Sequence, residues 1–234
     1  MSLLTSKNEI ERNRTKKMSA RLISYSKGVV PELNTLESLV SYCARVSNPN
    51  NQMNMLSSKR LLKYLFANKH WSPLEMVSVC LEISTTRDIA RQILRHRSFS
   101  FQEFSMRYSN PLENNLTMIL REARLQDVKN RQNSIDTNDT VLKQKWEEVQ
   151  KDILVKCSSS YNWAIENGIA KEQARAVLPE GMMESKLYMN GTLRSWIHYI
   201  ELRQENGTQK EHREIAIKCK NEITPIFPLI NDLI

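Results

Sequence analysis

The stretch Arg95–Tyr108 reads RHRSFSFQEFSMRY. It is poor core material, because only three phenylalanines and a methionine in it are suited to burial. Arg95, Arg97 and Arg107 carry planar guanidinium groups that suit bidentate contact with phosphate or carboxylate. Glu103 lies between them and, when ionised, accepts hydrogen bonds from N–H or O–H groups of a ligand. The stretch therefore predicts a site for an anionic ligand, although a run of arginine and serine is also typical of a solvated face.

The spacing within this stretch is more specific than its composition. It fits the pattern R-H-R-x-x-S-x-x-x-x-S-x-R-Y at every specified position, and this pattern resembles the signature of the flavin-dependent thymidylate synthases. Other segments resemble the same family in the same order, namely CARVSN at 43–48, HWSPLE at 70–75, ARAVLP at 174–179 and TLRSWIHYIELR at 192–203. The resemblance covers most of the chain and leaves out the amino-terminal tail and a polar insertion at 126–138.

The resemblance implies a fold class and a reaction. The fold would be α+β, with helices around a largely antiparallel sheet and with neither a Rossmann motif nor a P-loop. The protein would be a homotetramer with active sites between subunits. It would methylate dUMP reductively to dTMP, with methylenetetrahydrofolate as carbon donor, FAD as carrier and NADPH as reductant.

The resemblance also implies roles for individual residues. Contacts with dUMP are expected from Gln92, Arg95, Glu103, Phe104, Ser105, Met106, Arg107, Arg175 and Arg203. Contacts with FAD are expected from Ser72, Arg95, His96, Arg97, Glu103, Thr192, Leu193, Arg194 and His198, and His70 and Tyr108 are additional candidates. No metal site is expected.

Arg203 is the residue expected to be catalytic. Its charge near the uracil N3–O4 edge would favour negative charge there and make C5 more nucleophilic, without a covalent adduct to the enzyme. Ser105 is interpreted as a binding hydroxyl because no motif supplies a base to activate it. His96, flanked by two arginines, should resist protonation. On the helix 192–203, Arg194 and His198 share a face, whereas Arg203 lies about half a turn away.

Length and charge leave alternatives open. A chain of 234 residues suits one domain, so we expect a single catalytic domain over 19–234 behind a basic tail over 1–18. The formal net charge of +8 is compatible with a polyanionic partner, but no RNP, zinc-finger or basic-zipper pattern is present. A basic nucleic-acid-binding protein and a flavin or nucleotide sensor without turnover remain the rival interpretations.

Cysteines and glycines are sparse. The four cysteines are far apart and form no CxxC pair, which favours a reducing compartment, and with no apolar leader or membrane-length run we expect a cytoplasmic protein. The five glycines cannot form a glycine-rich phosphate loop. Any nucleotide must therefore be held by side chains and helix ends.

Hydrophobic periodicity and capping residues predict the secondary structure. Strands are expected at 20–26, 76–84, 117–125 and 183–189. Helices are expected from 34 or 35 to about 46, from 57 or 58, from 85 or 86, from 138 or 139 to 167, over 192–203, and after a capping box at Thr208–Glu211. The apolar stripe of the long helix that ends at 167 is expected to lie in the core. Pro73 is expected to fix an extended turn. Arg87, Arg91 and His212 are expected to lie in solvent.

Overall fold

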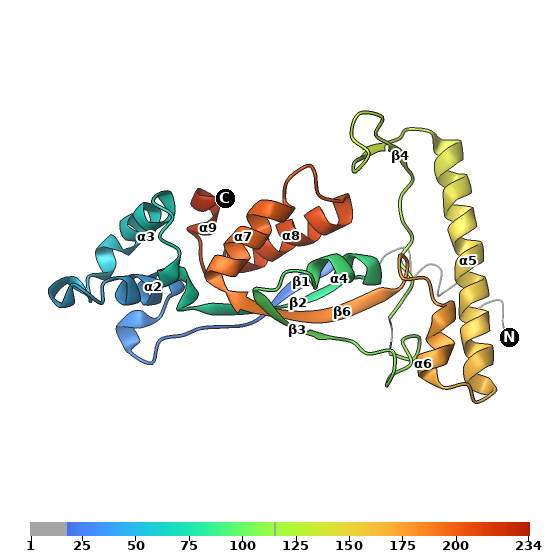
Figure 1. The fold of residues 1–234 in the computed structure, drawn as a ribbon, viewed down its shortest axis with the longest axis horizontal. Helices are drawn as coiled ribbons and strands as arrows, with labels where there is room; N and C mark the ends of the chain where they lie inside the picture. Colours follow the sequence, from blue (N-terminus) through green and yellow to red (C-terminus); the bar gives the residue numbers. More distant parts are fainter. Residues whose placement is uncertain (1–17, 115) are drawn as a thin grey trace. The chain divides into compact units, whose positions relative to one another are not determined.

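The protein is an α+β structure in which helices accompany a four-stranded antiparallel sheet (Figure 1). The computed structural model describes residues 18–114 and 116–234. The sheet has the order β1-β2-β6-β3, formed by Ser19–Tyr25, Ser78–Thr86, Glu184–Thr192 and Phe99–Glu103. The predicted fold class is confirmed. The basic tail predicted over 1–18 lies, except for Met18, outside the described residues.

The described chain divides into two compact units. We call them the α5 unit (Met18, 84–93 and 103–187) and the α7 unit (19–83, 94–102 and 188–234). Strands β2, β3 and β6 each contribute residues to both units.

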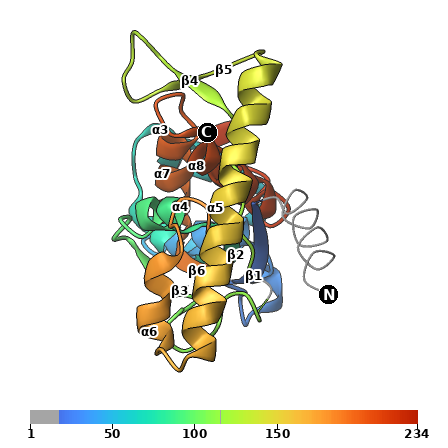
Figure 2. The same ribbon diagram turned by 90° about the vertical axis from the view of Figure 1, so that its right-hand side faces the viewer.

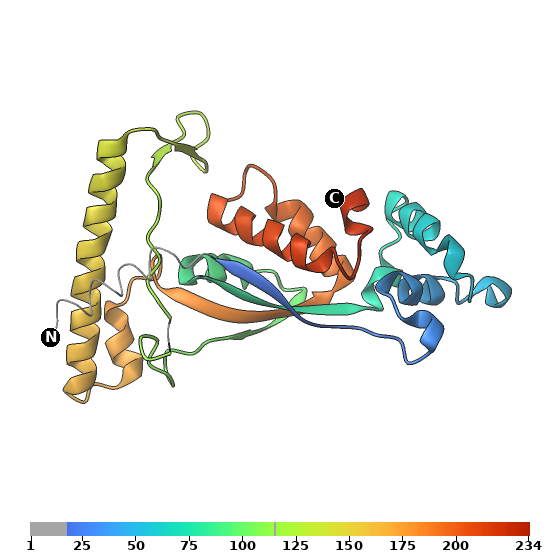
Figure 3. The same ribbon diagram turned by 180° about the vertical axis from the view of Figure 1, so that it is seen from behind.

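The α7 unit holds most of the predicted helices. Their bounds are η1 Pro31–Leu33, α2 Leu36–Ala44, η2 Pro49–Asn51, η3 Met55–Ser57, α3 Ser58–Ala67, η4 Ser72–Glu75, α7 Leu193–Arg203, α8 Lys210–Ile223 and α9 Ile230–Leu233. Thr35 caps α2 as predicted, in a capping box with Ser38. Helices α7 and α8 run side by side (Figures 1 and 3). On the sheet below them, Trp196 of α7 donates its indole N–H to the carbonyl oxygen of Val79 at 2.9 Å.

Strand β3 was not predicted, although it contains the centre of the stretch Arg95–Tyr108. Phe99 begins the strand, is 8% exposed, and packs edge-on against Trp196 with ring centroids 4.9 Å apart. A Cβ on Gly191 of β6 would lie 2.4 Å from Cδ1 of Phe99, so only glycine allows this approach. This close packing places Phe99 beside the start of α7.

The α5 unit is built on one long helix. Its elements are α4 Arg87–Ile93, β4 Arg124–Gln126, β5 Ser134–Asp136, α5 Thr140–Glu166, α6 Lys171–Ala174 and η5 Arg175–Val177. Asp139 caps α5 by accepting from the backbone N–H of Leu142 at 2.9 Å, and Gly168 follows the helix at φ 77°, as the capping signals predicted. Figure 2 shows α6 beside α5.

Two sequence predictions in this unit were wrong. Residues 117–125 form no continuous strand, because Met118 makes only an isolated bridge with Met183. The last two of these residues begin β4, which pairs with β5 of the polar insertion in an antiparallel hairpin. The apolar stripe of α5 is only partly in the core. Tyr161 and Ala164 are buried, whereas Leu142, Trp146, Val149 and Ile153 are 39 to 43% exposed.

Among the described residues, no helix is long and apolar enough to cross a membrane.

Candidate active site

The predicted site residues belong to both units. The α5 unit contains Gln92, Glu103, Phe104, Ser105, Met106, Arg107, Tyr108 and Arg175. The α7 unit contains His70, Ser72, Arg95, His96, Arg97, Thr192, Leu193, Arg194, His198 and Arg203. Most residues expected at dUMP are therefore in the first unit, and most expected at FAD are in the second.

In the α5 unit, one glutamate brings two predicted arginines together. The side chain of Arg107 pairs with the carboxylate of Glu172 at 3.3 Å, and Arg175 Nε donates to the backbone oxygen of Glu172 at 3.3 Å. Lys171 Nζ donates to the backbone oxygen of Tyr108, also at 3.3 Å. Three cationic side chains from two distant segments thus lie around one point of α6. Such a cluster can bind a phosphate.

Glu103 is already held by protein donors. Its side chain, 16% exposed, accepts from Ser185 Oγ at 2.7 Å and from Arg91 Nη1 at 3.1 Å, and Arg87 Nη1 lies 3.7 Å away. Arg87 and Arg91 also approach Glu180. The prediction that these two arginines are solvated was wrong for Arg87, whose side chain is 8% exposed, because α4 directs it toward two carboxylates.

Three neighbours of Glu103 are placed differently from one another. Met106 is 5% exposed and belongs to the core of the α5 unit, so only its backbone is available to a ligand. Phe104 packs on the same core, and its backbone N–H donates to Lys186 at 2.9 Å. Ser105 Oγ accepts from the backbone N–H of Arg107 at 3.4 Å, which leaves its hydroxyl proton for another acceptor.

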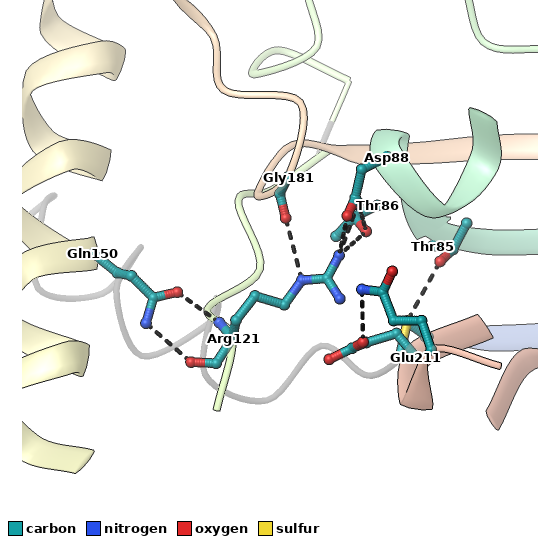
Figure 4. A network of polar contacts seen from close by, with 9 residues as sticks. Thr85, Thr86, Asp88, Arg121, Gln150, Gly181 and Glu211 are labelled. Atoms are coloured by element: carbon teal, nitrogen blue, oxygen red, sulfur yellow. Dashed lines mark hydrogen bonds and ion pairs between the residues drawn. The ribbon is translucent and has the colours of Figure 1, made fainter. Parts of the chain in front are cut away.

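A second polar network in the α5 unit centres on Arg121 and was not predicted (Figure 4). Arg121 Nη2 contacts both carboxylate oxygens of Asp88 at 2.8 and 3.0 Å, and Nε donates to the backbone oxygen of Gly181 at 3.2 Å. Gln150 of α5 exchanges two hydrogen bonds with the Arg121 backbone, at 2.7 and 2.9 Å. The network ties α4, α5 and the loop before β6 together, and the expected first-turn position of Asp88 is confirmed.

In the α7 unit, Arg203 contacts His96, the only histidine of the stretch Arg95–Tyr108. Arg203 Nε donates to His96 Nε2 at 2.9 Å. The His96 ring meets Tyr199 edge-on at 4.9 Å and lies 6.4 Å from the ring of His212. His212 Nε2 is 3.2 Å from Tyr199 Oη. Arginine, tyrosine and two histidines from three segments thus form one cluster.

Burial keeps the two histidines and the tyrosine around Arg203 uncharged. Burial, aided by the Arg203 guanidinium, lowers the pKa of His96 from 6.5 to about 4, as its expected resistance to protonation requires. Burial lowers the pKa of His212 to about 3, and electrostatic interactions with Arg203 and His96 contribute to this shift. Burial also raises the pKa of Tyr199 well above 10, with Cys219 adding to the rise and Arg203 opposing it.

The expected position of His212 in solvent was wrong. The residue is fully buried, on the stripe of α8 that also includes Ile215, Ala216 and Cys219. This helical spacing was a sequence signal that it faces inward. The predicted capping box was wrong too: Gln209 is at the cap position without a side-chain cap bond, and Thr208 Oγ1 bonds Leu202 instead.

The start of α7 meets the turn that contains Ser72. Thr192 caps α7 as predicted, with its Oγ1 accepting from the backbone N–H of Ser195 at 3.2 Å. Arg194 pairs with Glu75, and His198 meets Trp71 edge-on at 4.4 Å. The turn is a 3-10 helix rather than extended, because Pro73 starts it with a φ suited to a helix.

The partners of Arg194 and Arg203 lie on different segments, as the two-face interpretation of α7 requires. The backbone N–H of Leu193 is already engaged by Val77 at 3.0 Å, and the Leu193 side chain is buried.

Arg95 and Arg97 remain available for a ligand. Both side chains are exposed, and within the described residues neither has an acidic partner. Ser72 and His70 are exposed as well. Each of the two guanidinium groups can make a bidentate contact with an anion such as a phosphate.

Comparisons with known proteins extend over nearly the whole chain. A family model described as thymidylate synthase complementing protein (Thy1) matches residues 21–229. A probable flavin-dependent thymidylate synthase of Paramecium bursaria Chlorella virus 1 is 50% identical over 213 residues, covering 91% of this chain and 97% of the relative. The flavin-dependent thymidylate synthase of Synechocystis sp. is 48% identical over 216 residues, with the same two coverages.

Among solved structures, a UMP/dUMP methylase PolB from Streptomyces cacaoi bound with 5-Br dUMP has the same fold. The TM-score is 0.77 at 22% identity, and the match covers 93% of this chain and 94% of that one.

The fold defines an α+β protein with an antiparallel sheet, and the candidate site is rich in arginine. The matched sequence then identifies the family: the chain belongs to the flavin-dependent thymidylate synthases. The predicted resemblance is confirmed.

Proposed function

We propose that this protein methylates dUMP reductively to dTMP. Methylenetetrahydrofolate gives the carbon, FAD carries it, and NADPH reduces the flavin. Membership of the flavin-dependent thymidylate synthase family supports this reaction. The observation in the structure that carries it is the Arg107–Glu172–Arg175 cluster, in which two motif arginines from distant segments form one cationic surface.

The α5 unit would bind the nucleotide phosphate and sugar. Arg107 and Arg175 are suited to the phosphate because each has donors beyond those used on Glu172. Ser105 would add a hydroxyl, and Glu103 would accept from a ligand donor while Ser185 and Arg91 fix its direction. Gln92, Arg95, Phe104 and the Met106 backbone would complete the dUMP contacts.

The α7 unit would hold FAD. Arg95 and Arg97 would bind its diphosphate, for which their exposed and unpaired guanidinium groups are suited. Ser72, His96, Thr192, Leu193, Arg194 and His198 would supply further contacts, with Glu103, His70 and Tyr108. When bound, FAD supplies the redox and carbon-carrier chemistry.

Arg203 would activate the uracil. A guanidinium at the N3–O4 edge stabilises the negative charge that develops as C5 becomes nucleophilic. No cysteine lies in the stretches 70–75, 95–108, 174–179 and 192–203 that supply the proposed contacts. Burial also raises the thiol pKa of Cys80, Cys157 and Cys219, which disfavours these three as nucleophiles. The protein's part is therefore to orient the ligands and to place charge.

The proposed assembly is a homotetramer of one-domain subunits, each with its catalytic domain over 19–234. The uncovered stripe on α5, made of Leu142, Trp146, Val149 and Ile153, supports it. Apolar side chains three and four residues apart form a continuous face suited to packing against another helix.

A visible spectrum of the purified protein tests the proposal. We expect flavin absorbance that bleaches when NADPH is added without oxygen, and release of the C5 hydrogen of dUMP when methylenetetrahydrofolate is present. Bound flavin without hydrogen release would favour a sensor. A colourless protein whose binding to DNA or RNA falls steeply with salt would favour a nucleic-acid-binding protein.

A further inference from the structure

Tyr199 of α7 and His212 of α8 form a buried polar pair. The two residues are 1% and 0% exposed, and His212 Nε2 lies 3.2 Å from Tyr199 Oη. Their rings are 5.8 Å apart. Burying a hydroxyl and an imidazole is unfavourable unless they are hydrogen-bonded, so this bond restricts both rings to one arrangement.

Both residues of this pair lie next to the His96 ring. Tyr199 presents its ring to the His96 imidazole at 4.9 Å with an interplanar angle of 87°, and the tyrosine is also packed against Phe99 and Trp196. Aromatic rings in edge-to-face contact fix each other's orientation. The orientation of His96 therefore depends on Tyr199.

His96 in turn fixes Arg203. An Nε2 atom that accepts a hydrogen bond from Arg203 Nε carries no proton, so His96 is the neutral tautomer with its proton on Nδ1. The bond holds one edge of the guanidinium and leaves the Nη donors for a ligand. A rotation of the imidazole would turn that guanidinium away.

We propose that Tyr199 and His212 are positioning residues for the methylation reaction: their buried hydrogen bond fixes the ring against which His96 packs, and His96 holds the guanidinium of Arg203. The inference rests on the proposed function, in which Arg203 faces the uracil. Neither residue touches a ligand; both act through His96 and Arg203.

The test measures C5 hydrogen release from saturating dUMP by the full chain with FAD, NADPH and methylenetetrahydrofolate. Tyr199→Phe keeps the ring and removes the hydroxyl, and we expect it to lower kcat about tenfold, less than the roughly hundredfold that an ångström of misplacement can cost. The KM for dUMP and the bound flavin should be unchanged. In an Arg203→Lys background, the same change should cost less than about twofold, because the guanidinium that it positions is gone.

Two further variants separate positioning from folding. Tyr161→Phe removes the hydroxyl of another fully buried tyrosine, which belongs to the α5 unit and whose Oη has no hydrogen-bond partner among the described residues, and it should leave kcat unchanged. His212→Leu should reproduce the loss of Tyr199→Phe, whereas His212→Gln, which can still bond the Tyr199 hydroxyl, should recover most of it.

The inference would be overturned if Tyr199→Phe lowered kcat by the same factor in the wild-type and Arg203→Lys backgrounds. An unchanged kcat in Tyr199→Phe would also overturn it. An unmodified protein that binds flavin but releases no C5 hydrogen would overturn the proposed function itself, and this inference with it.

Discussion

Arg203 Nε donates a hydrogen bond to His96 Nε2 at 2.9 Å, joining two residues that are 107 positions apart. His96 comes from the start of the arginine-rich stretch Arg95–Tyr108, and Arg203 comes from the last turn of α7. A cation that donates to an imidazole requires that imidazole to be neutral. The charge state of one motif therefore controls the geometry of the other.

The folded protein should lose stability as the pH falls below 6.5. Folding lowers the pKa of His96 from 6.5 to about 4 and that of His212 from 6.5 to about 3. Between pH 6.5 and these lower values, the unfolded chain therefore binds protons that the folded chain does not. Stability from these residues is complete above pH 6.5 and is lost as the pH falls toward 4 and then 3. Urea unfolding at several pH values between 7 and 4 should show this fall.

Substitution separates the histidine contribution from acid effects on carboxylates. His96→Gln should make the free energy of unfolding less dependent on pH between 6.5 and 4. His70→Gln is the matched control, because His70 is exposed, and it should leave the dependence unchanged. An identical dependence in all three proteins would contradict the burial argument.

Arg203→Ala should retain flavin and lose turnover. The guanidinium faces His96, whereas the groups proposed for the FAD diphosphate are Arg95 and Arg97. Loss of one donor to developing charge lowers kcat by about a hundredfold or more. Flavin absorbance and C5 hydrogen release are measured on the same sample. Arg97→Ala is the contrast and should lose flavin; normal turnover in Arg203→Ala would remove the role assigned to Arg203.

Local patterns predicted the starts of three helices, because capping signals are within one turn of the chain, but Thr85 and Thr86 belong to strand β2 and Ser57 makes no side-chain cap bond. Thr35, Asp139 and Thr192 each accept a hydrogen bond from the backbone at the start of their helices, as capping preferences indicate. Alternation likewise placed Val79, Leu81 and Ile83 on the buried face of β2.

Pairings between distant segments could not be predicted in this way. Arg87 resembles any surface arginine until Glu103 and Glu180 are placed beside it. The burial of His212 had a local signal, but its bond to Tyr199 depends on how α7 and α8 pack. The motif resemblance named Arg107 and Arg175, and only the fold reveals that both contact Glu172.

Arg87 and Arg91 should differ in their effect on stability, although both approach Glu103 and Glu180. The Arg87 side chain is 8% exposed, so Arg87→Met should lower the free energy of unfolding by about 3 kcal/mol, as removal of one partner from a buried pair does. The Arg91 side chain is 45% exposed, and Arg91→Met should cost less than about 1 kcal/mol. Equal losses in urea unfolding would contradict the difference in burial.

Gly191→Ala should destabilise the packing of β6 against β3. The added Cβ would lie 2.4 Å from Cδ1 of Phe99, and that ring is itself fixed by Trp196, so it cannot move aside at little cost. Overpacking of this kind costs about 1 to 3 kcal/mol. Gly207→Ala is the control, since no atom lies within 4 Å of its added Cβ. Gly191→Ala should therefore have a lower thermal unfolding temperature than Gly207→Ala. Similar unfolding temperatures would show that the Phe99 ring moves aside at little cost.

Arg175→Ala should weaken dUMP binding more than FAD binding. Arg175 lies beside Arg107 through their shared contact with Glu172, in the α5 unit, whereas the exposed arginines proposed for FAD belong to the α7 unit. Loss of one charge-assisted contact with a phosphate costs about 1.5 to 3 kcal/mol, which is roughly a tenfold to hundredfold rise in the dUMP dissociation constant. Calorimetric titration measures the affinity for dUMP, and retention of flavin during dialysis reports on the affinity for FAD. Arg131→Ala, which removes the same charge from the exposed loop between β4 and β5, should change neither. Equal weakening of both ligands by Arg175→Ala would mean that this guanidinium is not specific to the nucleotide phosphate.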